Sequence, residues 1–100
     1  MIRPVAAAVV RRAVRQKGFR DAEHPAGRDH EMFFLHVQDK KTAFFVKLSR
    51  GTNQLRQDEI RNNARMLGVS GDDLYRIVCC DYDSQETLRV YTGSRHAGAT

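Results

Sequence analysis

The residues best suited to chemistry in this sequence are a histidine and the basic side chains around it. His30 follows Asp29 at the start of a segment in which apolar residues occupy alternate positions. A histidine has an ordinary pKa of about 6.5, so it can accept and release a proton at neutral pH. RNA cleavage without a metal ion needs such a group to take the 2′-hydroxyl proton. His30 is therefore the candidate acid/base residue, and the alternative is a loop histidine that hydrogen-bonds a turn.

The sequence predicts neither a metal site nor a cofactor site. His36 shares the predicted strand face of His30, but six residues of strand separate the two by about 20 Å, too far for one metal ion. Glycine-rich phosphate loops and dinucleotide fingerprints are missing as well. Cys79 and Cys80 are neighbours, so a disulfide between them would be strained. We expect both to be small buried hydrophobic residues in a reduced, cytoplasmic chain.

The charge of the chain is positive and uneven. Its 100 residues hold 17 Lys and Arg against 12 Asp and Glu, for a net charge of +5. Residues 1–20 alone hold six basic and no acidic residues, which indicates a polyanionic partner such as RNA. Arg11, Arg12 and Arg15 lie opposite the apolar stripe of a predicted helix, where they would contact phosphates. The alternative is that they form a solvated helix face.

Two alternating segments predict a β-hairpin with one apolar and one mixed face. The mixed face is too apolar to meet only water. A partner protein, a second copy of the chain or a further layer would cover it, or its rings would stack with bases beside a phosphate-binding lysine. The residues expected in the core are Phe33, Leu35, Val37, Phe44, Val46 and Leu48, and those of the mixed face are His30, Met32, Phe34, His36, Phe45 and Lys47.

Helices on either side of the hairpin position these side chains. Apolar residues recur every three or four positions over residues 4–17 and 55–67, which predicts a helix in each range. Gly18 and Gly68 follow these ranges directly and are placed to end the helices in a left-handed conformation.

The rest of the chain predicts short helices and a tail. Ser70 and Asp83 are spaced to cap two short helices, and residues 92–100 are small and polar. The fold class is therefore α+β. We expect one two-layer domain over residues 1–91, in which a hairpin, or three strands, packs against helices.

Short sequence motifs lie at the junctions between these elements. Lys17-Gly18-Phe19 closes the first helix, Gly27-Arg28-Asp29-His30 opens the hairpin and Lys47-Leu48-Ser49-Arg50-Gly51 closes it. In these motifs and in the order of its elements, the chain resembles the HicA-like (YcfA-like) proteins of bacterial toxin–antitoxin pairs. The resemblance covers roughly residues 5–91.

This resemblance implies a fold like the double-stranded-RNA-binding domain and an mRNA-cleaving toxin masked by a partner antitoxin. The catalytic histidine of the family aligns with His30, and the family has serine where this chain has Asp29. The Ser-His-Gly motif that follows the second strand in the family is replaced here by Ser49-Arg50-Gly51.

Two functions follow from the sequence. The first is a metal-independent endoribonuclease with His30 as acid/base. The second is a non-catalytic module that binds a protein, or forms a homodimer, through the mixed face. The phosphate-binding residues of the first function would be Lys47, Arg28 or Arg50, and the interface of the second would be Met32, Phe34 and Phe45.

The size of the chain limits both hypotheses. Its longest apolar run, Val5–Val10, is too short to cross a membrane, so we expect a cytoplasmic protein. A chain of 100 residues is also small enough that we expect the basic helix, the mixed face and His30 to share one surface.

Overall fold

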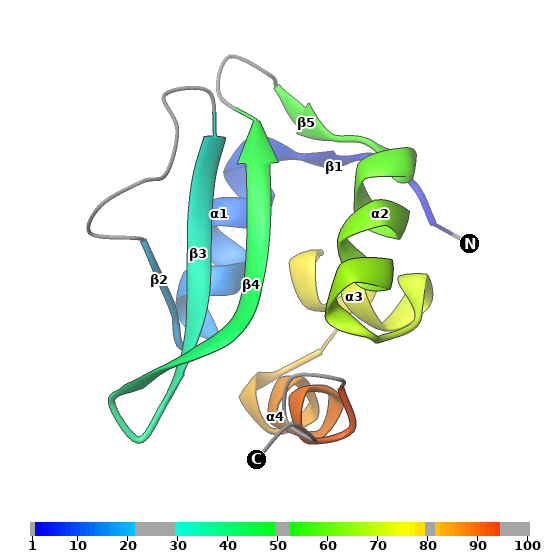
Figure 1. Cartoon of the computed structure of the whole chain (residues 1–100). Coiled ribbons are helices and arrows are strands. Elements are labelled where there is room, and N and C mark those ends of the chain that lie inside the picture. Colours follow the sequence, from blue (N-terminus) through cyan, green and yellow to red (C-terminus); the bar gives the residue numbers. More distant parts are fainter. Residues whose placement is uncertain (1, 22–29, 50–52, 80–81, 95–100) are drawn as a thin grey trace.

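The alternating segments form a three-stranded antiparallel sheet in the computed structural model, which describes residues 2–21, 30–49, 53–79 and 82–94. The strand order is β2-β3-β4, so the predicted hairpin gains a third strand from the segment after the first helix. The fold is α+β, as the sequence predicts (Figure 1). In chain order the elements are β1 (Val5–Ala6), α1 (Ala7–Gln16), β2 (Phe19–Asp21), β3 (His30–Val37), β4 (Lys40–Ser49), β5 (Gln54–Leu55), α2 (Gln57–Leu67), α3 (Gly71–Val78) and α4 (Ser84–Thr92).

A two-residue turn joins β3 and β4. Gln38 and Asp39 occupy it with φ angles of 53° and 64°. Two consecutive positive φ angles are typical of the type I′ hairpin turn, whose twist matches that of the flanking strands. The turn sets a register in which Val37 lies opposite Lys40 at the start of the ladder.

The register shifts once along this hairpin. The two-residue step from Phe34 to His36 faces a four-residue step from Phe45 to Lys41. Thr42 lies in the resulting bulge, where its Oγ1 donates a hydrogen bond of 2.7 Å to a backbone carbonyl of β3. Because the shift is an even number of residues, the alternation of faces is kept, and Lys41 lies on the same face as Phe45.

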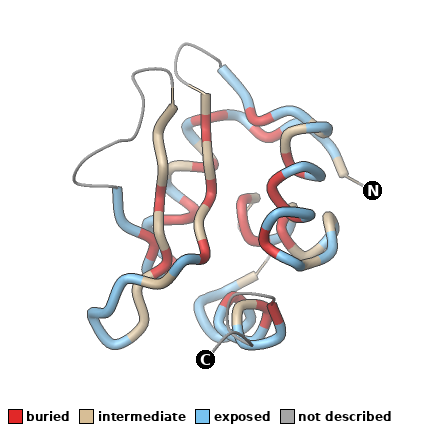
Figure 2. Tube along the Cα trace, in the orientation of Figure 1, coloured by how far each residue is buried: buried red, intermediate tan, exposed pale blue. Residues whose placement is uncertain are grey.

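The apolar face predicted for the hairpin lies in the core. Buried positions alternate along β3 and β4 (Figure 2). Among the six predicted core residues of the sheet, only Val37, near the turn, is partly exposed. The buried side chains of β3 and β4 are Phe33, Leu35, Phe44, Val46 and Leu48, and the members of the same core cluster on the two longest helices are Ala7, Val10 and Val14 of α1 and Ile60, Ala64 and Leu67 of α2.

The first helix is shorter than predicted. α1 begins at Ala7 instead of Pro4, because Val5–Ala6 pair with Gln54–Leu55 in a small second sheet. The same pairing delays α2, which begins at Gln57 instead of residue 55. Two-residue strands have no period of their own, so the helical pattern beside them conceals them in the sequence.

The predicted helix ends and caps are confirmed. Gly18 and Gly68 have φ angles of 94° and 73°, the left-handed region that glycine adopts without strain. Ser70 and Asp83 each accept a side-chain hydrogen bond from the backbone N–H three residues ahead, at 3.0 and 2.9 Å. These bonds satisfy N–H groups that have no partner inside a helix.

The end of the described chain is packed further than expected. α4 continues through Thr92, and Ser94 is only 4% exposed, although a tail was expected from residue 92. Residues 95–100 lie outside the described part of the chain. None of the described helices is both long and apolar enough to cross a membrane.

Candidate functional site

His30 and Ser49 lie opposite each other at one end of the main ladder. His30 is the first residue of β3, Ser49 is the last of β4, and the two are cross-strand partners. Lys47 is two residues before Ser49, so it is the diagonal neighbour of His30, about 7–8 Å away. The predicted acid/base residue and the predicted phosphate-binding lysine are therefore close enough to contact the same nucleotide.

A pocket of about 580 Å³ adjoins this end of the ladder. Glu59, in the first turn of α2, links two residues that line the pocket. The Glu59 carboxylate accepts hydrogen bonds from Ser49 Oγ at 3.4 Å and from the Arg56 backbone N–H at 3.0 Å. Glu59 is not among the site residues predicted from the sequence. Its signal was its place three residues after Arg56, where an acid can cap a helix start. The residues that line the pocket are Ser49, Asn53, Gln54, Arg56 and Glu59.

One ring nitrogen of His30 is unusual. Nδ1 is buried and has no hydrogen-bond partner among the described residues, while the residue as a whole is partly exposed. Buried polar atoms almost always have a partner, and an exception calls for an explanation such as a catalytic role or a bound molecule. By contrast, Nδ1 of His36, at the other end of the same strand, lies 3.0 Å from the Phe34 carbonyl oxygen.

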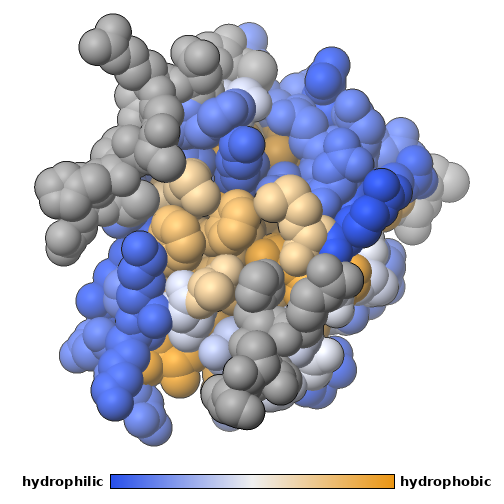
Figure 3. All heavy atoms as spheres, viewed as in Figure 1, coloured by the Kyte–Doolittle hydropathy of each residue, from blue (hydrophilic) through white to orange (hydrophobic). Residues whose placement is uncertain are grey.

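The side of the sheet opposite α1 is called the open face below. Apolar residues gather in the middle of this side, over β3 and β4, with hydrophilic residues around them (Figure 3). The backbone pairing and the alternation of side chains define its members. They are Arg20 of β2, His30, Met32, Phe34 and His36 of β3, and Lys41, Ala43, Phe45, Lys47 and Ser49 of β4.

Two phenylalanine rings form the centre of the open face. Phe34 and Phe45 are cross-strand partners, with ring centroids 5.4 Å apart and planes tilted by 40°. Nζ of Lys41 lies 4.1 Å from the centroid of Phe34, a cation–π contact. Lys41 is not among the mixed-face residues predicted from the sequence; it joins them because β4 begins at Lys40, so the alternation continues from Phe45 back to Lys41.

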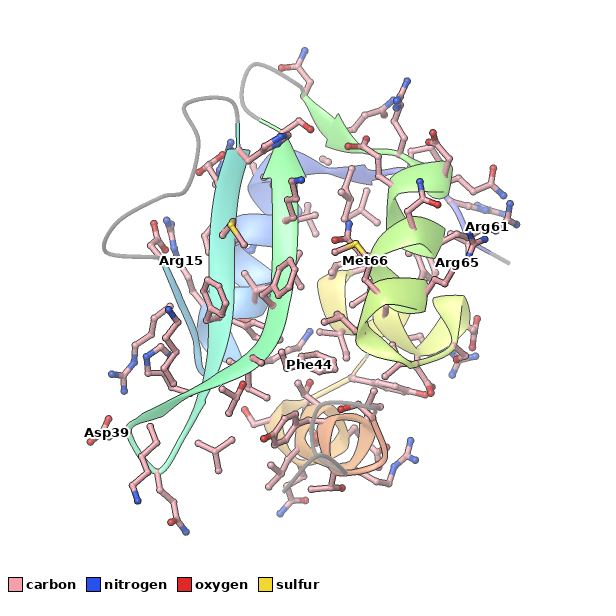
Figure 4. All side chains as sticks on the ribbon, in the orientation of Figure 1. Arg15, Asp39, Phe44, Arg61, Arg65 and Met66 are labelled. Atoms are coloured by element: carbon pink, nitrogen blue, oxygen red, sulfur yellow. The ribbon has the colours of Figure 1, made fainter. Side chains whose placement is uncertain are left out.

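Carboxylates of the sheet hold two of the three α1 arginines that were predicted to bind phosphate. Arg11 donates to Glu31 from Nε at 3.2 Å and from Nη2 at 2.7 Å, and these hydrogen bonds raise the pKa of Arg11. Arg15 forms an ion pair of 3.0 Å with Asp21 of β2, and Figure 4 shows it beside that strand. Arg12 is exposed and has no ion pair within the described part of the chain.

The arginine face of α1 and the open face do not form one surface. α1 packs on the face of the sheet that carries Phe33, and the partners of its arginines, Glu31 and Asp21, point to that same face. Lys47 and His30 point to the other side. The single shared surface expected from the size of the chain is therefore not found, because the sheet stands between the two groups of cations.

Some predicted positions differ from the prediction or cannot be placed. Cys79 is only partly buried, unlike the sequence prediction, and Cys80 lies outside the described residues. Arg28 and Arg50 lie outside the described residues. In the ranges that are described, no group of three or more His, Cys, Asp or Glu side chains is arranged to hold a metal ion.

The chain was compared with known protein families, curated proteins and solved structures. No protein family, no curated protein and no solved structure matches the chain.

Proposed function

We propose that this protein binds RNA and cleaves it without a metal ion, with His30 as the acid/base residue. The observation that supports the proposal best is the juxtaposition of His30 and Lys47 at the end of the β3–β4 ladder. The resemblance to HicA-like toxins agrees with it, because His30 aligns with the catalytic histidine of that family. An mRNA substrate would place the protein in the cytoplasm, and a partner antitoxin would mask its activity.

The proposed chemistry uses His30 and Lys47. His30 takes the proton of a ribose 2′-hydroxyl, and the 2′ oxygen attacks the adjacent phosphorus. The bond from phosphorus to the 5′ oxygen breaks, leaving a 2′,3′-cyclic phosphate, and the departing oxygen takes a proton from solvent. The Lys47 ammonium offsets the negative charge on the phosphate oxygens. Glu59, through Ser49, is a positioning residue at the end of β4.

A cleavage assay with a matched histidine control tests this proposal. Purified protein is incubated with a labelled RNA in EDTA, and the cyclic-phosphate product is measured. We expect His30→Ala to slow cleavage by about 10²–10⁴-fold, the usual contribution of a general acid or base. His36→Ala changes a histidine of the same strand and face and should retain activity.

Two results contradict the proposal. One is equal cleavage by wild type and His30→Ala. The other is cleavage that appears only after a divalent metal is added back.

A non-catalytic interaction module is the second candidate. It is favoured by the half-buried apolar residues of the open face, Met32, Phe34 and Phe45. Met66 of α2, 52% exposed, points toward the sheet in Figure 4 and adds an exposed apolar side chain. In that case Phe45→Asp would disrupt self-association or partner binding, and RNA would remain intact with wild-type protein.

A further inference from the structure

We infer that the RNA taken by this protein is single-stranded and that one of its unpaired bases stacks on the ring of Phe45. The inference rests on the proposed function and adds its substrate class. It starts from the two rings at the centre of the open face and from the charges around them.

The rings have different surroundings. Lys41 lies over Phe34 on the open face, with Nζ 4.1 Å from the ring centroid. Phe45 is partly exposed, and no cation of the described residues lies over its ring. Phe34 therefore holds a cation, whereas Phe45 packs partly against the core and its exposed part is available to a flat ligand. Every base has a π face, so such a ring accepts bases of any sequence.

The charges of the open face favour a polyanion over a second copy of the chain. None of the ten positions that define this face is Asp or Glu. Lys41 and Lys47 lie on the same strand on either side of Phe45, and Lys47 is about 7 Å from it. Arg20, the third cation, pairs with Asp39 of the turn, which lowers the pKa of that carboxyl. Two open faces in contact would bring like charges together, whereas phosphates on both sides of a stacked base would neutralise the lysines.

The arrangement favours a single strand over a duplex. In a duplex the bases stack on one another and their faces are hidden, so a duplex offers phosphates and 2′-hydroxyls but no free ring to Phe45. Cations for a duplex backbone would have to lie in rows at the surface. The helix that carries such a row, α1, packs on the opposite face of the sheet, and Arg11 and Arg15 are paired there.

The open face also leads to the proposed cleavage site. Phe34 and His30 lie on the same face of β3, four residues or about 13 Å apart. A strand held at Phe45, the partner of Phe34, would pass Lys47 and reach His30 within a few nucleotides. Base binding and cleavage thus use separate residues that can be changed independently.

A binding experiment with the His30→Ala protein tests the inference without degradation of the RNA. Its affinity for a single-stranded RNA is compared with its affinity for a duplex of the same sequence. We expect tighter binding of the single strand. Phe45→Leu in this background should weaken it by about fivefold or more, the usual effect of losing one stacked base. Phe45→Tyr keeps the ring and should keep the affinity, and Leu88→Ala removes an exposed apolar residue of α4 as a control.

A fluorescent base gives a second readout that does not depend on a variant. Single strands that carry 2-aminopurine at successive positions are titrated with the His30→Ala protein. Stacking on Phe45 should quench the fluorescence of at least one position, and Phe45→Leu should remove this quenching. Circular dichroism of each variant shows that the fold is kept.

The outcomes separate this inference from the proposed function. Equal affinity for single strand and duplex, or no quenching at any position, overturns the inference, even if cleavage depends on His30. A concentration-dependent dimer that Phe45→Leu dissociates also overturns it, because the ring would then be buried in a protein interface. If Phe45-dependent binding is found and no cleavage occurs, the inference stands and the proposed ribonuclease activity is wrong.

Discussion

At the level of single residues, Arg11 and Arg15 form ion pairs with carboxylates of the sheet. Arg11 makes a bidentate contact with Glu31, in which both side chains are partly buried. The contact joins α1 to β3 across 20 residues of sequence. Bidentate pairs of this kind are stronger than exposed ion pairs because the guanidinium matches the carboxylate geometry.

We therefore expect Arg11 to stabilise the folded protein. Arg11→Ala should lower the free energy of unfolding by about 1 kcal/mol, because it removes charged hydrogen bonds that are partly screened by water. Arg12→Ala, an exposed neighbour on the same helix, should change it by less than about 0.5 kcal/mol. Urea unfolding measures both. If Arg11→Ala left stability unchanged and weakened RNA binding, Arg11 would be a ligand-binding residue.

At the level of elements, Gly18 joins the first helix to the sheet. Its φ angle is 94°, and its carbonyl accepts a hydrogen bond from the His36 N–H at 3.0 Å. A Cβ at this position would meet the His36 carbonyl oxygen at 3.4 Å. The turn that places β2 beside β3 therefore depends on a residue without a side chain.

Gly18→Ala should destabilise the protein by more than about 1 kcal/mol, because alanine is strained at this φ angle. Gly93 is a suitable comparison. It has a φ angle of −87°, and a Cβ there would meet its nearest atom, the Arg89 carbonyl oxygen, at 3.7 Å. Gly93→Ala should therefore be neutral or slightly stabilising. Thermal unfolding distinguishes the two, and equal melting temperatures would show that the Gly18 turn relaxes.

At the level of the whole molecule, the sheet separates two groups of cations. Arg11, Arg12 and Arg15 line an open hollow of about 530 Å³ on α1, together with Ala8 and Gln16. Lys41 and Lys47 lie on the open face, on the other side. The salt dependence of RNA binding can assign the ligand to one side, since each phosphate contact contributes its own share of the slope.

We expect the open face to carry this dependence. Lys47→Ala should reduce the slope of log affinity against log salt by about 0.7 for a single strand. Arg12→Ala removes a charge from the opposite side and should leave the slope unchanged. Affinities at four or five salt concentrations measure both slopes. A reduced slope for Arg12→Ala alone would move the RNA to α1 and contradict the proposed site.

Much of the fold could be predicted because its signals are local. Strand alternation separated the core face from the open face, and Gly18 and Gly68 ended the helices where predicted. The pairing of β1 with β5 could not be predicted, because two residues carry no period. The bulge around Thr42 also left no signal, since an even shift keeps the alternation intact.

For the candidate site, the sequence by itself determined which residue types share a strand face. His30, Phe34, Phe45 and Lys47 lie on one face because side chains alternate along a strand with a period of two. Only the tertiary structure decided that Glu59 reaches Ser49, that Lys41 lies over the Phe34 ring and that the α1 arginines lie behind the sheet. These contacts depend on packing between elements that are distant in sequence. Neither the charge nor the periodicity of a segment indicates which side of the sheet a helix covers.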